Sequence, residues 1–200
     1  EKDRYELKIA GLLHDCGKIT TPVHVVDKAT KLQTLFDRIA LIDTRFEVLM
    51  RDLEIAQLRG ELDPAACAER RAQLASDRDF LRQCNTGGEF MADDRIARVE
   101  RIAAYPWRGP DGNVQPFLSA DEVENLSIRR GTLTAAERDI INHHIVMTNR
   151  LLEALPWPPH LRHVPEYAGG HHERMDGKGY PRGLTREQMS VPARVMGIAD

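Results

Sequence analysis

The sequence predicts an all-α protein, and three observations support this fold class. Strict alternation of apolar and polar residues, which marks a half-buried strand, is scarce along the 200 residues. Helix-start signals precede several apolar stretches. Residues 31–58 carry apolar side chains at alternating steps of three and four, which is the heptad pattern of a coiled-coil helix. The positions in this pattern are Leu32, Leu35, Ile39, Ile42, Phe46, Leu49, Leu53 and Ala56.

A second long helix is expected directly after the heptad stretch. Gly60 ends the first helix, and Asp63 followed by Pro64 supplies a capping side chain and a proline suited to the first helical turn. Two long helices joined by a short turn predict an antiparallel helical hairpin.

Shorter helices are predicted around this hairpin. Ser119 can cap a short helix, and Thr134 with Glu137 three residues later has the spacing of a capping box. Residues 105–118 are rich in proline and glycine and are predicted to form a loop. The remaining helices are expected over residues 1–13, 93–104, 119–126, 135–155 and 164–173, with a last one after Pro192.

Composition restricts the class of protein. The net charge of −3 does not suit a general binder of nucleic-acid polymers, which needs a basic face. Cys16, Cys67 and Cys84 lie far apart, which fits reduced thiols in the cytoplasm better than a disulfide framework. No apolar run has the length of a membrane helix, so no membrane contact is expected from this segment. Both ends fall inside apparent helices, so the sequence is expected to be part of a longer protein.

Histidine and aspartate gather in motifs that suit a metal site. Residues 14–18 read HDCGK, and residues 171–181 read HHERMDGKGYP. His and Asp are common ligands of hydrolytic metal centres. Asp200 follows an apolar helix, where an unpaired carboxylate would be costly and a cation is a natural partner.

His143 and His144 are adjacent and must be distinguished. On a continuous helix, His144 shares an apolar face with Ile140, Met147 and Leu151, whereas His143 turns toward water. His144 is therefore the inward candidate, and the alternative for it is a satisfied core histidine. His24, His160 and His163 lie in loop-like contexts and are interpreted as surface residues.

These motifs together resemble the HD-GYP family, a branch of the HD metal-dependent phosphohydrolases. The resemblance rests on HDCGK at 14–18, LTAAERDIINHH at 133–144 and HHERMDGKGYPRGLTREQMSVPARVMGIAD at 171–200. It covers residues 1–32 and 119–200 and implies an HD-domain helical bundle. Residues 33–118 would then be an inserted coiled-coil-like hairpin. The family has further ligands upstream of HDxGK, and no histidine precedes residue 14, so the sequence is expected to begin after them.

The resemblance also implies the reaction and the site. The expected activity is hydrolysis of cyclic di-GMP to pGpG, and further cleavage to GMP is left open. Two or three divalent ions are expected, iron or manganese, while the sequence leaves zinc open. Asp15 would bridge two ions, and Lys18 and Tyr180 would contact the substrate together with Arg182. The implied metal ligands are His14, Asp15, His144, His171, His172 and Asp200.

Two other functions stay open at this point. The chain could be a non-catalytic receptor for a cyclic dinucleotide or a docking module for a partner such as a diguanylate cyclase, and it could act on another nucleotide. A sensor or receiver domain is an expected neighbour. Apolar positions beside the hairpin seam predict a homodimer through the insertion, and these are Leu41, Val48, Ile55 and Leu58.

Overall fold

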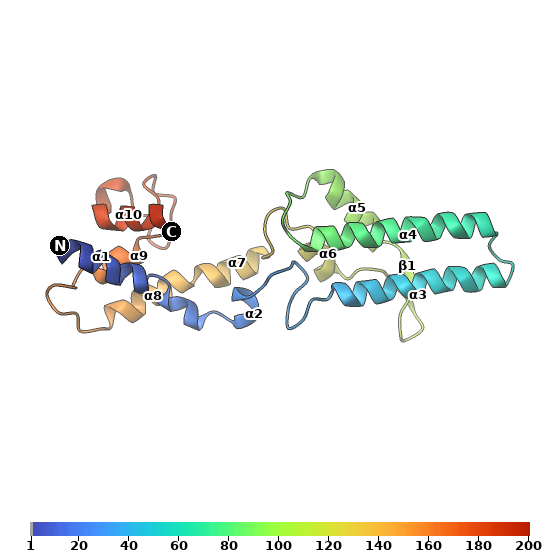
Figure 1. The fold of residues 1–200 in the computed structure, drawn as a ribbon, viewed down its shortest axis with the longest axis horizontal. Helices are drawn as coiled ribbons and strands as arrows, with labels where there is room; N and C mark the ends of the chain where they lie inside the picture. The colour runs from blue at the N-terminus through green and yellow to red at the C-terminus, as the bar shows by residue number, and fades with distance from the viewer. Residues whose placement is uncertain (1) are drawn as a thin grey trace. The chain divides into compact units, whose positions relative to one another are not determined.

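The computed structural model describes residues 2–200 and divides into two compact units. One unit holds the chain up to Val26 together with Ala136–Asp200, and the other is Asp27–Ala135. Both are built mainly from helices, which confirms the predicted all-α class (Figure 1). The second unit encloses the predicted insertion, residues 33–118; its role as an insertion into a catalytic domain stays a prediction.

The first unit is a small helical bundle. Its elements are α1 (Lys2–Leu13), η1 (Cys16–Thr20), α2 (Val23–Val26), α7 (Ala135–Asn142), α8 (His144–Glu153), α9 (Val164–Gly169), η2 (Arg186–Gln188) and α10 (Val191–Ala199). Helix α9 packs against α1, α8 and α10, and η1 packs against α8. The core combines Ala10 from α1, Leu152 from α8, and Val164, Tyr167 and Ala168 from α9. Helices α1, α8 and α10, which are distant from one another in sequence, therefore meet around α9.

Gly17 allows η1 to lie directly on the start of α8. A Cβ atom at position 17 would come 2.0 Å from the carbonyl oxygen of His144 and 2.5 Å from the amide nitrogen of Thr148. The Gly17 amide instead donates to Thr148 Oγ1 at 2.9 Å. Because any side chain would force the two elements apart, this position requires glycine. The contact places the HDCGK segment beside His144.

The predicted continuous helix over residues 135–155 is wrong. It breaks at His143 into α7 and α8. His144 is buried and His143 is exposed, as expected, but Ile140 and Leu151 are each more than 40% exposed. The buried face of α8 is formed by His144, Ile145, Thr148, Asn149 and Leu152.

The two other helices at the C-terminal end follow the sequence signals in part. The predicted helix over 164–173 ends at Gly169, so His171 and His172 lie in the turn that follows it. The last helix begins as expected, with Pro192 in its first turn and the Ser190 hydroxyl accepting from Ala193 N.

The second unit contains the predicted hairpin. Its elements are α3 (Ile39–Leu58), α4 (Pro64–Asn85), α5 (Asp93–Ala103), β1 (Pro106–Arg108), β2 (Val114–Pro116) and α6 (Ala120–Leu126). Helices α3 and α4 pack along each other (Figure 1). The Asp63 side chain caps α4 by accepting from the amides of Ala65 and Ala66. Ser119 and Glu122 form a full capping box on α6.

The heptad helix begins eight residues later than the pattern predicts. Residues 31–38 form a folded loop, in which Leu32 is fully buried but Leu35 is 93% exposed. Hydrogen bonds hold this loop: the Leu32 amide donates to Asn85 Oδ1 at 2.8 Å, and the Arg38 guanidinium donates to the Leu32 carbonyl at 3.1 Å. The apolar repeat from Ile39 to Ala56 therefore lies on α3, whereas Leu32 and Leu35 precede the helix.

The hairpin is one part of a larger core. Leu81 of α4, Ile102 of α5 and Leu126 of α6 are all buried in one cluster, and the rings of Phe46 and Phe117 lie 4.6 Å apart. The prediction of a simple coiled-coil hairpin is therefore incomplete, because α5 and α6 cover apolar side chains that a hairpin alone would expose to solvent.

The predicted loop over residues 105–118 contains a small antiparallel hairpin. Strands β1 and β2 pair with Trp107 opposite Gln115. Three-residue strands are too short to show a reliable alternation in sequence. Separately, none of the helices within residues 2–200 is long and apolar enough to cross a membrane.

A buried ion pair links the hairpin to α6 and gives a stability prediction. Arg45 makes two 2.8 Å hydrogen bonds to the Glu122 carboxylate, whose side chain is 3% exposed, and another to the Phe117 carbonyl.

We expect Arg45→Met to lower the free energy of unfolding by about 3 kcal/mol, because Glu122 would stay buried without its cation. Urea unfolding followed by Trp107 fluorescence in a Trp157→Phe background measures this. Arg51→Met, on the exposed face of α3, is the control. Equal losses for both variants would contradict the prediction.

The predicted homodimer can be tested on the outer face of α3. Leu41 and Ile55 are each 45% exposed, and Leu58 is 87% exposed. We expect the pair of substitutions Leu41→Glu and Ile55→Glu to shift a dimer to monomers, because charges would replace apolar contacts spaced two heptads apart. Sedimentation velocity of the parent and the variant checks this. A parent that is monomeric at all concentrations refutes the dimer.

Candidate metal centre

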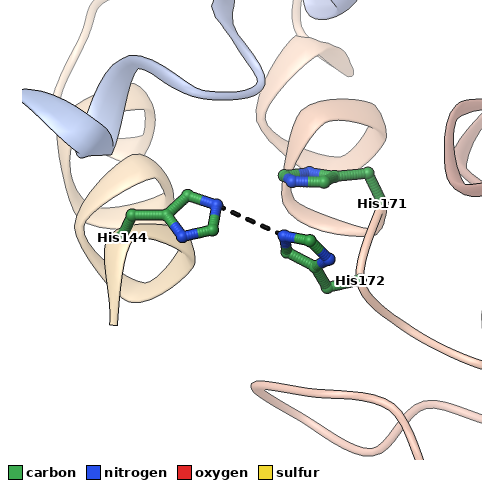
Figure 2. A group of neighbouring side chains, drawn as sticks. All are labelled: His144, His171 and His172. Atoms are coloured by element: carbon green, nitrogen blue, oxygen red, sulfur yellow. Dashed lines mark hydrogen bonds between the residues drawn. The ribbon is translucent and has the colours of Figure 1, made fainter. Parts of the chain in front are cut away.

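The six side chains predicted as metal ligands all lie at ends of helices in the first unit. His14 and Asp15 follow α1, and His144 begins α8. His171 and His172 follow α9, and Asp200 follows α10. In Figure 2 the rings of His171 and His172, on one side, face the ring of His144 on the other. Whether they bind metal stays a prediction; their proximity is a structural fact.

The Asp15 carboxylate lies among these imidazoles. Its Oδ1 is 3.2 Å from His144 Nε2 and 4.0 Å from His171 Nε2, and its Oδ2 is 3.4 Å from His14 Nε2. His14 Nε2 also lies 3.2 Å from Asp200 Oδ1. The carboxylate thus has one oxygen toward each of two groups of donors, which is the arrangement needed to bridge two cations.

Two groups of donors are each compact enough for one ion. The first is His144, His171 and His172, and the second is His14, Asp15 and His171, with the donor atoms of each group within 4.8 Å of one another. The Nε2 atoms of His144 and His172 are 3.3 Å apart (Figure 2). Nitrogen and oxygen donors of this kind suit iron, manganese or zinc.

Three of the histidines are fixed in the same tautomer by the backbone. The Nδ1 atom of each lies close to the carbonyl oxygen three residues earlier: Gly11 for His14 at 2.8 Å, Ile141 for His144 at 2.5 Å and Ala168 for His171 at 2.6 Å. A hydrogen on Nδ1 satisfies each carbonyl and leaves the Nε2 lone pair free. This is the usual support for a metal-binding histidine.

His171 tests whether a cation fits. Its side chain is fully buried, and its Nε2 atom has no hydrogen-bond partner among the described residues. Buried polar atoms without a partner are rare and costly. An ion at this point would satisfy the atom, so the residues present fit a metal.

The surroundings of Asp15 keep it ionised. Burial raises the pKa of its carboxyl, but the hydrogen bond from Lys18 and the neighbouring imidazoles outweigh this and hold the pKa below its ordinary value. Lys18 Nζ lies 2.6 Å from Asp15 Oδ2, and the lysine side chain is 43% exposed. Lys18 is therefore at the site, paired with the central carboxylate and open to solvent.

The two adjacent histidines are kept neutral. Burial lowers the pKa of His171 although the Ala168 carbonyl opposes the shift. Burial, together with the neighbouring His171 and His144, lowers the pKa of His172 to about 4. At neutral pH both imidazoles therefore have the uncharged form that binds a metal.

The predicted substrate contacts have different environments. The Tyr180 ring stacks on His172, with centroids 4.8 Å apart and planes at 15°, and its hydroxyl donates to Asn142 Oδ1 at 3.2 Å. The tyrosine is thus half-buried against the histidines. Arg182 is exposed, and within the described residues its ionic neighbour is Glu153 at 3.9 Å, so the structure gives no contact between Arg182 and the six donors. Substrate binding by either residue stays a prediction.

Sequence reasoning missed three residues that support the site. Thr148 binds the Gly17 amide, Asn142 binds the Tyr180 hydroxyl, and Glu173 binds the backbone after the Gly-Tyr-Pro turn. Glu173 directly follows the paired histidines, which is the only signal that could have indicated it. Asn142 and Thr148 carry no such signal, because their partners are far away in sequence.

Parts of the sequence are similar to known proteins. Residues 120–200 match the family model described as HD domain. A 37-residue segment is 57% identical to the 3'3'-cGAMP-specific phosphodiesterase 1 of Vibrio cholerae, covering 18% of this chain and 9% of that protein. A 77-residue segment is 34% identical to the cyclic di-GMP phosphodiesterase of Thermotoga maritima, covering 38% and 21%. The 3'3'-cGAMP-specific phosphodiesterase 3 of Vibrio cholerae is 34% identical over 70 residues, covering 35% and 15%. No solved structure gives a significant match.

The adjacent histidines at 143 and 144 give a direct test of the site. We expect His144→Ala to lower the affinity for Mn²⁺ at least about 10-fold, because a buried donor facing Asp15 and His172 is lost. His143→Ala removes an exposed ring on the same segment and should leave the affinity unchanged. Free Mn²⁺ measured by electron paramagnetic resonance during titration checks both. A larger loss for His143→Ala would contradict the inward position of His144.

Proposed function

We propose that this chain, in which residues 120–200 form an HD domain, is a metal-dependent phosphodiesterase of cyclic dinucleotides. One observation carries the proposal: Nε2 atoms of histidines from three helix ends surround the Asp15 carboxylate, and His14, His144 and His171 each have Nδ1 bound to the backbone. The match of residues 120–200 to the HD-domain family model supports the resemblance to HD phosphohydrolases predicted from the motifs. Membership of the HD-GYP branch rests on the Gly179-Tyr180-Pro181 turn and is part of the proposal.

The donors divide into two sets around Asp15. His144, His171 and His172 would hold one ion, His14 and Asp200 would hold the other, and Asp15 would bridge them. Divalent ions at this place supply positive charge for the phosphoryl oxygens and lower the pKa of a water molecule. We propose iron or manganese, as the resemblance to the HD-GYP family implies; the mixed nitrogen and oxygen donors suit both of these ions and zinc as well.

The chain's own residues have separate tasks around the ions. Asp15 stays ionised because of Lys18 and the imidazoles, so it can accept two cations without first losing a proton. The Lys18 ammonium is partly exposed next to that carboxylate. If Asp15 takes up cations, Lys18 is released to face an anionic substrate, so we assign it to the phosphate of the nucleotide.

The substrate class comes from the relatives. Their names specify 3'3'-cGAMP or cyclic di-GMP, both of which are cyclic dinucleotides. We propose cyclic di-GMP as the substrate, with pGpG and then GMP as products, in the cytoplasm, and 3'3'-cGAMP as the competitor to be tested beside it. The aligned segments cover only 9–21% of the three relatives' lengths. We propose that the catalytic unit works beside a domain that senses a signal.

A non-catalytic receptor or docking module is the alternative. Such a protein needs the nucleotide contacts but not a complete set of metal donors. All six predicted donors are present and close together, which supports catalysis over the receptor.

Asp15→Ala tests the proposed reaction. We expect hydrolysis of cyclic di-GMP to fall by about 100-fold or more, because the bridging carboxylate is lost together with part of the bound metal. Chromatography of the products from cyclic di-GMP and from 3'3'-cGAMP, with elemental analysis of anaerobically prepared protein, measures both effects. Asp139→Ala, an exposed carboxylate on α7, is the matched control. Normal turnover with full metal content in Asp15→Ala would refute the two-ion site.

A further inference from the structure

We infer that Glu173 is a positioning residue: through the Gly-Tyr-Pro turn it holds the Tyr180 ring against His172 and so orients that imidazole toward the metal. This rests on the proposed function only in assuming that His172 binds an ion. The turn is therefore assigned a task inside the metal centre, in addition to any contact with substrate.

Glu173 is a buried carboxylate whose two oxygens are used by the backbone of the turn. Its residue exposure is 6%. Oε1 accepts from the amide of Arg182 at 2.7 Å, and Oε2 accepts from the amide of Leu184 at 2.8 Å. Burying a charge is costly unless it receives hydrogen bonds, so these two bonds explain why a charged residue is tolerated here. They also fix the chain immediately after Pro181.

The other side of the turn rests directly on the histidine segment. The Tyr180 amide donates to the His172 carbonyl at 3.2 Å. At position 179, a Cβ atom would lie 2.2 Å from the Arg174 amide nitrogen and 2.5 Å from the Glu173 Cα atom, so only glycine allows this approach. The turn is consequently held at two points, before Tyr180 and after Pro181.

His172 needs an external support more than the other histidines do. His14, His144 and His171 each have Nδ1 near a carbonyl oxygen three residues earlier. No such carbonyl contact of the His172 ring occurs in residues 2–200, where its hydrogen-bonding neighbour is His144 Nε2. The His172 ring packs against two rings: the tilted ring of His171 at 4.2 Å and the parallel ring of Tyr180 at 4.8 Å and 15°.

The chemistry of the amides decides which substitution is informative. Two backbone N–H donors require two acceptor oxygens. Glutamine keeps the length of Glu173 but offers one oxygen and one NH₂ group, so it places a donor against a donor. Glu173→Gln should release one end of the turn without removing any metal donor.

The test is Mn²⁺ affinity of the full chain, measured by electron paramagnetic resonance of free Mn²⁺. We expect Glu173→Gln to weaken binding about 10- to 100-fold, the usual effect of losing a group that orients a ligand. Tyr180→Leu removes the stacked ring and should have the same effect, while Tyr180→Phe keeps the ring and should stay within about 3-fold of the parent. Glu187→Gln makes the same change on an exposed glutamate of η2 and should not alter affinity.

Each outcome decides the proposal. Parental Mn²⁺ affinity in folded Glu173→Gln overturns it, and so does parental affinity in Tyr180→Leu, which serves if Glu173→Gln fails to fold. An equal loss in Tyr180→Phe would also overturn it, because the hydroxyl and not the ring would then be responsible. Hydrolysis of cyclic di-GMP by the parent is assayed separately, so a negative result there removes the proposed function and leaves the Mn²⁺ comparison valid.

Discussion

The contact between Gly17 and the first turn of α8 is the constraint on which the site depends. Gly17 and Thr148 are 131 positions apart in sequence, and the hydrogen bond between them joins the HDCGK segment to α8. A Cβ at position 17 would overlap the His144 carbonyl oxygen, so a side chain there would separate Asp15 from His144. The glycine of this motif therefore acts on the site through packing, by bringing two elements close enough for their side chains to share a cation.

Helix ends supply the second requirement of a metal centre, which is oriented ligands. The last carbonyl groups of a helix have no amide partner within it. Gly11 and Ala168 lie in the last turns of α1 and α9, and their carbonyls meet the Nδ1 atoms of His14 and His171. The break at His143 has the same consequence, because Ile141 lies in the last turn of α7 and its carbonyl meets His144. The break between α7 and α8 thus leaves the Ile141 carbonyl free to accept from His144, and this bond orients the His144 imidazole.

Electrostatics and packing act in the same direction at this site. Burial favours neutral imidazoles at His171 and His172, whereas the Lys18 ammonium and the neighbouring imidazoles hold the pKa of Asp15 low and favour its ionised form. The unit Asp27–Ala135 has a different basis, since its core is apolar. Its buried charged groups receive polar partners: Glu122 pairs with Arg45, and the Lys31 ammonium donates to the carbonyls of Leu126 and Ile128. The Glu173 carboxylate is buried, it accepts hydrogen bonds from two backbone amides, and it follows the candidate ligand His172 in sequence.

The sequence by itself determined the helical class, the caps at Asp63 and Ser119, and the identities of the six candidate donors, because these depend on local patterns and short motifs. It predicted the inward position of His144, but it could not determine the break at His143 or the start of α3. The folded loop before Ile39 depends on Asn85, a partner far along the chain. The tertiary structure alone decided that Asp15 lies among the imidazoles, that the Tyr180 ring covers His172 and that Arg182 lies beside Glu153. The physical reason is that a motif specifies which atoms are offered, whereas packing between distant segments decides which of them meet.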